Sequence, residues 1–398
     1  MSTIRIDNTN IEEYFSNMRR CAKCILPETF PGIEFDEDGV CNYCRTYEPV
    51  KVFGEEKLKE RLEEYRNRGK KYDCIVAISG GRDSSFVLYN MVEKYDMRVL
   101  ALTVDSGAIT PEGYRNIKTI TESLGVDHVW IRDEAQIKTA KENTKIKFHA
   151  WLKKPSIHTI VPTLNAGDKT MNLRIYKYAD RNGIPLVIGG NIIGNSSFEQ
   201  EHFKTGFLGV FPDNRGNYST PDKIKLSILF AVEHFKSPCA FHLSILREYL
   251  EGAFVYFFES ILKPRSVDTL GFFDYIYWDE KEILSTIYKL GWEGASDATT
   301  TWRIDDAAYP LINYLYYNLV GFTEHDEMYS KMIREGQISR QEGLKRCMSD
   351  HHYRIPYMMK TLEELGVSKK EIDKVLEEYR KKLLSKVLRK HYERVIIE

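Results

Sequence analysis

A short apolar run that leads directly into two glycines and a group of hydroxyl side chains is the feature that most constrains this chain. Residues 74–85 read CIVAISGGRDSS. The apolar residues up to Ile78 suit a buried parallel strand, and the apolar spacing that follows Ser84 suits a helix. A strand, a glycine turn and a helix in this order predict one unit of a parallel α/β sheet.

The same turn has the chemistry of an anion site. Gly80 and Gly81 allow the backbone to pass close to a bulky anion. The N–H groups of the following helix would then face that anion along the favourable end of the helix dipole. Asp83 is suited to holding a magnesium ion. Hydroxyl donors are supplied by Ser79, Ser84 and Ser85. The spacing differs from that of the Walker motif.

Four of the seven cysteines form two C-x2-C pairs, Cys21 with Cys24 and Cys41 with Cys44. The stretch between the pairs, residues 31–40, predicts a hairpin that turns at Glu37-Asp38-Gly39. Four thiolates leave no coordination position for water, so the pattern predicts a structural zinc ribbon. An iron–sulfur cluster or a redox pair remains an alternative. An odd number of cysteines argues against a disulfide scaffold.

Further strands are predicted at residues 98–104, 127–131 and 184–188, with helices between them. This alternation predicts an α/β fold, a doubly wound parallel sheet with helices on both faces. Beyond residue 200 the pattern is mainly helical, apart from a long loop at 196–217. We therefore expect three regions: a zinc ribbon at 1–50, the sheet domain at 51–200 and a helical substrate or partner region at 201–398.

Ligands of such sheets bind beyond the carboxyl ends of the strands. We therefore expect Ser79–Ser85, Asp105–Gly107 and Gly189–Asn191 to converge on one site. Asp105 is the candidate to meet the adenosine portion of a nucleotide, with a turn cap as its alternative. Gly189 and Gly190 either admit a phosphate or substrate near the backbone or form a bare strand-end turn.

Charge and hydropathy narrow the class of protein. The chain has 57 basic and 58 acidic residues and a net charge of −1, so its charge does not call for a nucleic-acid face. No apolar run approaches the length needed to cross a bilayer, and residues 1–10 contain no secretory apolar region. We expect a cytoplasmic protein without a membrane partner.

The Ser79–Ser85 loop closely resembles the Ser-Gly-Gly-x-Asp-Ser pyrophosphatase loop (PP-loop) of enzymes that cleave ATP to AMP and pyrophosphate, with Arg82 where many relatives have lysine. The resemblance implies ATP and Mg²⁺ as ligands and catalytic roles for Ser79, Arg82 and Asp83. The implied nucleotide contacts are Ala77, Ser79, Gly80, Gly81, Arg82, Asp83, Ser84 and Ser85 in the loop, and Asp105, Gly189, Gly190 and Asn191 at the other strand ends.

Two further stretches, residues 20–44 and 321–343, are similar to the N-acetyl sugar amidotransferases, which make acetamidino sugars for bacterial surface polysaccharides and flagellar glycans. This resemblance implies that an acetamido oxygen attacks the α-phosphorus of ATP and that ammonia then displaces AMP. A glutaminase partner is implied as the ammonia source, because the sequence contains no evident glutaminase motif. Gly190-Asn191 departs from the expected Gly-Glu, and residues 297–306 suit either a sugar nucleotide or core packing.

Two alternative functions stay open. A PP-loop thiolase would deliver sulfur to an adenylated carbonyl, and Cys239 is the cysteine to test, against its reading as a packed thiol. A ribbon-bearing adaptor would bind nucleotide without catalysis. The helix predicted at 369–389 carries an apolar stripe suited to docking or to a homodimer.

Overall fold

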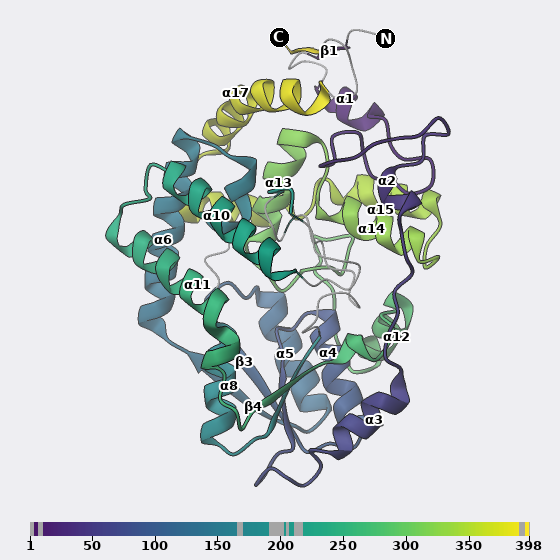
Figure 1. Ribbon diagram of the computed structural model, residues 1–398, viewed down its shortest axis with the longest axis vertical. Coiled ribbons are helices and arrows are strands. Elements are labelled where there is room, and N and C mark those ends of the chain that lie inside the picture. Colours follow the sequence, from purple (N-terminus) through teal and green to yellow (C-terminus); the bar gives the residue numbers. More distant parts are fainter. Residues whose placement is uncertain are drawn as a thin grey trace.

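The computed structural model describes residues 4–6, 11–164, 170–190, 203, 207–210, 218–389 and 395–397, with the backbone alone at 4–6, 256, 257, 260 and 395–397. A parallel five-stranded sheet has the order β4-β3-β2-β5-β6. It lies in the lower part of the molecule in Figure 1. The strands are β2 (Cys74–Ala77), β3 (Val99–Asp105), β4 (Asp127–Arg132), β5 (Leu186–Gly189) and β6 (Asp268–Gly271). The predicted doubly wound parallel sheet is confirmed.

The helices occupy both faces of the sheet and most of the C-terminal half. In the N-terminal half they are α1 (Ile11–Asn17), α2 (Asn42–Arg45), α3 (Glu55–Glu63), α4 (Arg82–Tyr89), α5 (Pro111–Ser123), α6 (Glu134–Lys153), α7 (Ile160–Leu164) and α8 (Met171–Arg181). In the C-terminal half they are α10 (Thr220–Lys236), α11 (Leu243–Leu262), α12 (Glu280–Lys289), α13 (Tyr309–Val320), α14 (Glu324–Arg334), α15 (Arg340–Asp350), α16 (Ile355–Leu365) and α17 (Lys369–Leu388). The termini form a small parallel pair, β1 (Ile4–Ile6) with β7 (Val395–Ile397).

Alternation along the strands places helices on both faces of the sheet. On β2, Cys74 and Val76 pack in one cluster with residues of α3, α4, α5 and α12, while Ile75 packs with residues of α8 in another. Strand residues that alternate between two buried faces are those of a sheet covered on both sides. The strand order changes direction between β2 and β5, and such a switch point opens a crevice at the carboxyl ends of the strands.

The sheet extends beyond the predicted domain boundary at residue 200. β6 pairs with β5 and lies in the region expected to be helical. Its sequence, DTLG, is too short and too mixed to show strand periodicity. The boundaries at 50 and 200 remain predictions.

The apolar stripe of α17 packs against other helices of the same chain. Ile372 and Leu376 are buried in the same cluster as α13 and α16 residues. α13 is itself buried on nearly every side, so it forms the centre of the helical region. The α17 stripe therefore does not provide the docking face that the sequence suggested. Across the described ranges, no helix is both long enough and apolar enough to pass through a bilayer.

Candidate functional site

The predicted anion loop joins β2 to α4 and passes very close to α5. Gly80 has a φ of 85°, and a Cβ there would lie 2.2 Å from the carbonyl oxygen of Gly113. A side chain at this position would need both a disfavoured backbone conformation and space that Gly113 already fills. Trp292 donates its indole N–H to the carbonyl of Gly80 at 2.9 Å, which holds the turn from the opposite side.

Hydroxyl groups and the start of α4 form the inner surface of the loop. The Oγ atoms of Ser79 and Ser84 lie 3.2 Å apart, and Ser85 donates to the carbonyl of Gly81 at 2.8 Å. Gly81 precedes α4 and has no side chain to cap it. The N–H groups of the first helical turn therefore remain suited to a bound anion.

A cavity of ≈ 1530 Å³ opens at the carboxyl ends of β2, β3 and β5, where the sheet changes direction. Most of the predicted contact residues line it, namely Ala77, Ser79, Gly81, Arg82, Asp83, Ser84, Gly189 and Gly190. Gly80 lies within the turn, and Ser85 is fully buried behind it. Asn191 lies outside the described residues. The convergence of the loop with the end of β5 is thus present in the structure.

The structure places the Asp105 carboxylate in the turn after β3. Its side chain is buried, accepts from the hydroxyl of Tyr114 at 2.6 Å and from the N–H of Gly107 at 2.7 Å, and pairs with Arg132. Asp105 is not one of the described residues that line the cavity. These bonds match the alternative role, in which the carboxylate organises the turn after β3. An adenosine contact stays a prediction.

Arg82 is buried and held by neighbouring side chains. Its Nη1 donates to Glu280 at 2.6 Å and to the hydroxyl of Thr301 at 2.8 Å. The guanidinium lies over the rings of Trp278 and Trp302, at 5.1 and 4.8 Å from their centroids. This arrangement favours a supporting role, in which Arg82 fixes the start of α4, over direct phosphate contact. The catalytic role stays a prediction.

A segment far along the chain packs against the loop and lines the same cavity. Arg303, Asp305 and Asp306 line the same cavity, and a Cβ on Gly81 would come within 2.9 Å of the Asp305 carboxylate. The segment is fixed to the loop after β3, because the N–H of Thr110 donates to the carbonyl of Asp305 at 3.0 Å. The sequence does not single out Arg303, Asp305 and Asp306 as neighbours of the loop. Its only signal is the mix of acidic and basic groups at 297–306, which suits either a sugar nucleotide or core packing.

Three carboxyl groups face the cavity in a poorly solvated position. Burial raises the pKa of Asp83 and of Asp305, and it raises the pKa of Asp306 to about 6. The negative charge of Asp305 adds to the shift at Asp83, so the two carboxylates are electrostatic neighbours. A divalent cation, which prefers oxygen ligands, would stabilise the ionised form of such carboxylates, so Asp83 and Asp305 are candidates to hold one.

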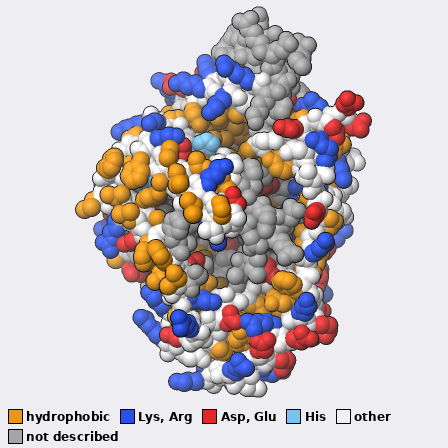
Figure 2. Space-filling model, in the orientation of Figure 1, with side chains coloured by type: hydrophobic (Ala, Val, Ile, Leu, Met, Phe, Trp, Pro, Cys, Tyr) orange, Lys and Arg blue, Asp and Glu red, His pale blue; other side chains and the backbone are white. Residues whose placement is uncertain are grey.

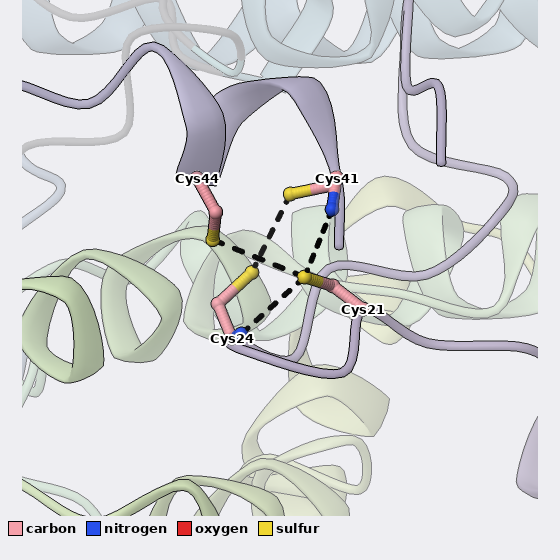
Figure 3. A group of neighbouring side chains, drawn as sticks. All are labelled: Cys21, Cys24, Cys41 and Cys44. Atoms are coloured by element: carbon pink, nitrogen blue, oxygen red, sulfur yellow. Dashed lines mark hydrogen bonds between the residues drawn. The ribbon is translucent and has the colours of Figure 1, made fainter. Parts of the chain in front are cut away.

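The four cysteines form a closed cluster (Figure 3). Sγ of Cys21 lies 3.8 Å from that of Cys44, and Sγ of Cys24 lies 3.8 Å from that of Cys41. A tetrahedron of sulfurs around one ion at about 2.3 Å has edges of about 3.8 Å. All four thiols are buried. The donor set and spacing fit a single metal ion, and a four-iron cluster would hold its cysteines further apart because irons and sulfides lie between them.

The cysteine segment is bound to the C-terminal helices. Arg340 donates to the carbonyls of Cys21 and Cys24 at 3.1 and 2.9 Å. Arg20 pairs with the buried carboxylate of Asp326 at 2.6 Å. Between the two pairs, a single antiparallel bridge joins Phe35 to Cys41, which reduces the predicted hairpin to a tight turn. A metal bound by the four cysteines would stabilise the segment that contacts α14 and α15.

The far end of the cavity lies between α6, α10 and α11. Lys147 bridges Glu248 of α11 and the carbonyl of Pro162, at 2.9 and 3.1 Å. Cys239 also lines the cavity and lies 3.2 Å from the hydroxyl of Ser237. The cavity thus continues from the loop into a compartment of mixed charge with aromatic walls.

The C-terminal segment is similar to a known protein family. Residues 298–392 match the family model described as LPS biosynthesis protein WbpG-like, C-terminal domain. The match includes the cavity segment 303–306 and helices α13 to α17. This part of the chain is therefore similar to that of a lipopolysaccharide-biosynthesis protein, which agrees with the resemblance seen at residues 321–343.

Other similarities are more distant. An uncharacterised protein of Methanocaldococcus jannaschii is 31% identical over 116 residues, which is 27% of this chain and 40% of that protein. The NH3-dependent NAD synthetase of Campylobacter jejuni overlaps with a TM-score of 0.26 at 13% identity, covering 59% of this chain and 88% of that one. The U34-tRNA thiolase NcsA of Methanococcus maripaludis overlaps with a TM-score of 0.24 at 14% identity, covering 63% and 90%.

Proposed function

We propose that this protein is an ATP-dependent, AMP-forming amidotransferase that exchanges the acetamido oxygen of an N-acetyl sugar, or of its nucleotide derivative, for nitrogen. The observation that carries the proposal is the contact between the Ser79–Ser85 loop and Asp305, which line one cavity together. Asp305 belongs to the segment that is similar to a lipopolysaccharide-biosynthesis family. The anion loop and the polysaccharide-related segment therefore build a single site.

The loop is proposed to hold the polyphosphate of ATP. The N–H groups at the start of α4 and the hydroxyls of Ser79 and Ser84 face the cavity, where they would stabilise the charge that develops on departing pyrophosphate. Asp83 and Asp305 would hold Mg²⁺, which supplies charge neutralisation at the phosphates. Arg82, held by Glu280, keeps the first turn of α4 in place.

The far compartment is proposed to hold the acceptor. At ≈ 1530 Å³ the cavity exceeds the 300–1,000 Å³ typical of a site for one small ligand, so it has room for ATP and a second molecule. Trp151 and Tyr249 offer aromatic walls, and Lys154 and Lys386 are exposed lysines at its boundary. Aromatic faces with nearby cations suit a sugar that carries an anionic nucleotide.

The reaction follows from the weakness of an amide as an electrophile. The acetamido oxygen attacks the α-phosphorus of ATP and releases pyrophosphate, and ammonia then adds to the carbon and displaces AMP. We propose that ammonia comes from a separate glutaminase. We also propose that Cys21, Cys24, Cys41 and Cys44 bind a structural Zn²⁺, because four thiolates leave no open position for a reactant.

Sulfur transfer is the second candidate function, and one observation favours it. Cys239 lines the cavity, is partly exposed and lies beside the hydroxyl of Ser237, so a thiol is available in the compartment proposed for the acceptor. The other cysteines outside the cluster, Cys74 and Cys347, are buried. Burial raises the pKa of both thiols, which makes them poor nucleophiles.

A product assay separates the two functions. The purified protein is incubated with ATP, Mg²⁺ and a panel of UDP- and CDP-linked N-acetyl sugars, in parallel with ammonium and with sulfide. We expect AMP and a sugar product about one mass unit lighter with ammonium, because NH replaces oxygen. A product about sixteen units heavier, formed with sulfide alone, would replace the amidotransferase by a thiolase and make Cys239→Ser the next variant.

A further inference from the structure

Helices α10 and α11 carry a large apolar face that nothing in the described chain covers. On α10, Ile224, Ile228, Val232 and Phe235 are each between 44% and 59% exposed. Phe241, in the turn between the helices, is 78% exposed, and its ring lies 5.7 Å from that of Phe235. Figure 2 shows apolar side chains gathered over α10 and α11.

The second helix contributes a stripe of its own. Leu243, Leu250, Phe254, Phe258 and Ile261 are exposed by 43% to 81%. Steps of three, four and seven residues place them along one side of α11, and the α10 residues follow the same steps. This spacing is typical of helices that pack lengthwise in a bundle.

The opposite side of the hairpin is already occupied. Leu226, Ile245 and Val255 are buried, and Glu248 accepts from Asn143 and from Lys147 on α6. The hairpin is therefore anchored to the protein and presents its second apolar side outward. Packing among the described residues does not explain this exposed apolar side.

We propose that the α10–α11 face is the interface of a homodimer, in which two hairpins pack across a two-fold axis as a four-helix bundle. Side chains of this size at half exposure leave roughly 100 Å² each, so the ten give about 1,000 Å². The largest apolar patch on a monomer is usually about 300–600 Å². A standard interface buries about 800 Å² on each partner, which this face meets.

Charge argues for a second copy over a lipid surface. α10 carries three lysines and two acidic residues, and α11 carries one arginine and three glutamates. Helices that bind anionic membranes are rich in lysine and arginine on their polar side. The two helices have a net charge near zero and are rich in phenylalanine, and this composition is typical of interfaces between subunits. The same hairpin walls the far compartment, so dimerisation would also order that wall.

Light scattering after gel filtration tests the proposal on the full-length protein at micromolar concentration. We expect twice the chain mass of 46.4 kDa. The double variant Leu250→Glu/Phe254→Glu places two charges at the centre of the face and is expected to give a monomer with an unchanged far-ultraviolet circular dichroism spectrum. The matched control is Met348→Glu, an exposed apolar residue on α15, which should remain dimeric.

Three results would overturn the proposal. A wild-type protein that is monomeric at all concentrations has no such interface. A dimer that survives the double variant associates through another surface. A monomer that binds vesicles of phosphatidylglycerol, and loses that binding in the double variant, would assign the face to a membrane.

Discussion

Replacing Asp83 by asparagine is expected to lower AMP formation by about 100-fold to 1,000-fold while leaving the fold intact. The carboxylate faces the cavity beside Asp305, and burial raises the pKa of both groups, so a divalent cation is the natural partner of their charge. Asparagine keeps the size of the side chain and removes that charge. Initial rates of AMP release at saturating ATP and Mg²⁺ measure the effect.

The neighbouring Asp305→Asn variant is expected to show a loss of similar size, because it removes charge from the same place. Asp127→Asn, at an exposed carboxylate on β4, is the control and should retain wild-type turnover. The thermal midpoint of each variant separates a chemical defect from unfolding. Unchanged AMP formation in Asp83→Asn would contradict the assignment of the loop.

Replacing Cys24 by alanine is expected to release one metal ion per chain and to lower the thermal midpoint by roughly 10 °C. The cluster is buried, and its knuckles accept the bonds of Arg340 and lie beside the Arg20–Asp326 pair. Loss of the ion would therefore loosen the contacts with α14 and α15 as well as the segment itself. Metal content by elemental analysis and melting by calorimetry measure the two effects.

Cys239→Ala serves as the matched control, since that thiol is far from the cluster in sequence and lines the cavity. It should keep both the metal and the melting temperature. Full metal content in Cys24→Ala would contradict a metal site made of the four cysteines. Iron in the wild-type protein would show that the bound ion is iron and not zinc.

The sequence was sufficient for the parts of the site that are local. Gly80, Gly81 and the flanking apolar run predict a strand, a turn and a helix, because the tight backbone leaves few other conformations. The four cysteines are also predicted to cluster from local sequence alone, because two C-x2-C pairs at this spacing are typical of one metal site. Both features need few contacts from elsewhere in the chain.

The remaining parts depend on contacts between distant residues. Asp305 lies against Gly81 because the backbone at 304–307 pairs with residues 108–110. No periodicity in the sequence predicts that pairing. The resemblance implies a nucleotide contact for Arg82, whereas the partner that holds its guanidinium, Glu280, lies nearly two hundred residues away and has no signal in the sequence.

The most direct test of the proposed chemistry follows the acetamido oxygen itself. UDP- and CDP-linked N-acetyl sugars carrying oxygen-18 in the acetyl carbonyl are turned over with ATP, Mg²⁺ and ammonium, and the AMP is examined by mass spectrometry. We expect AMP two mass units heavier, because the oxygen that attacks the α-phosphorus leaves with AMP. Unlabelled AMP, or label found in inorganic phosphate with ADP as the second product, would contradict activation of the acceptor by adenylation.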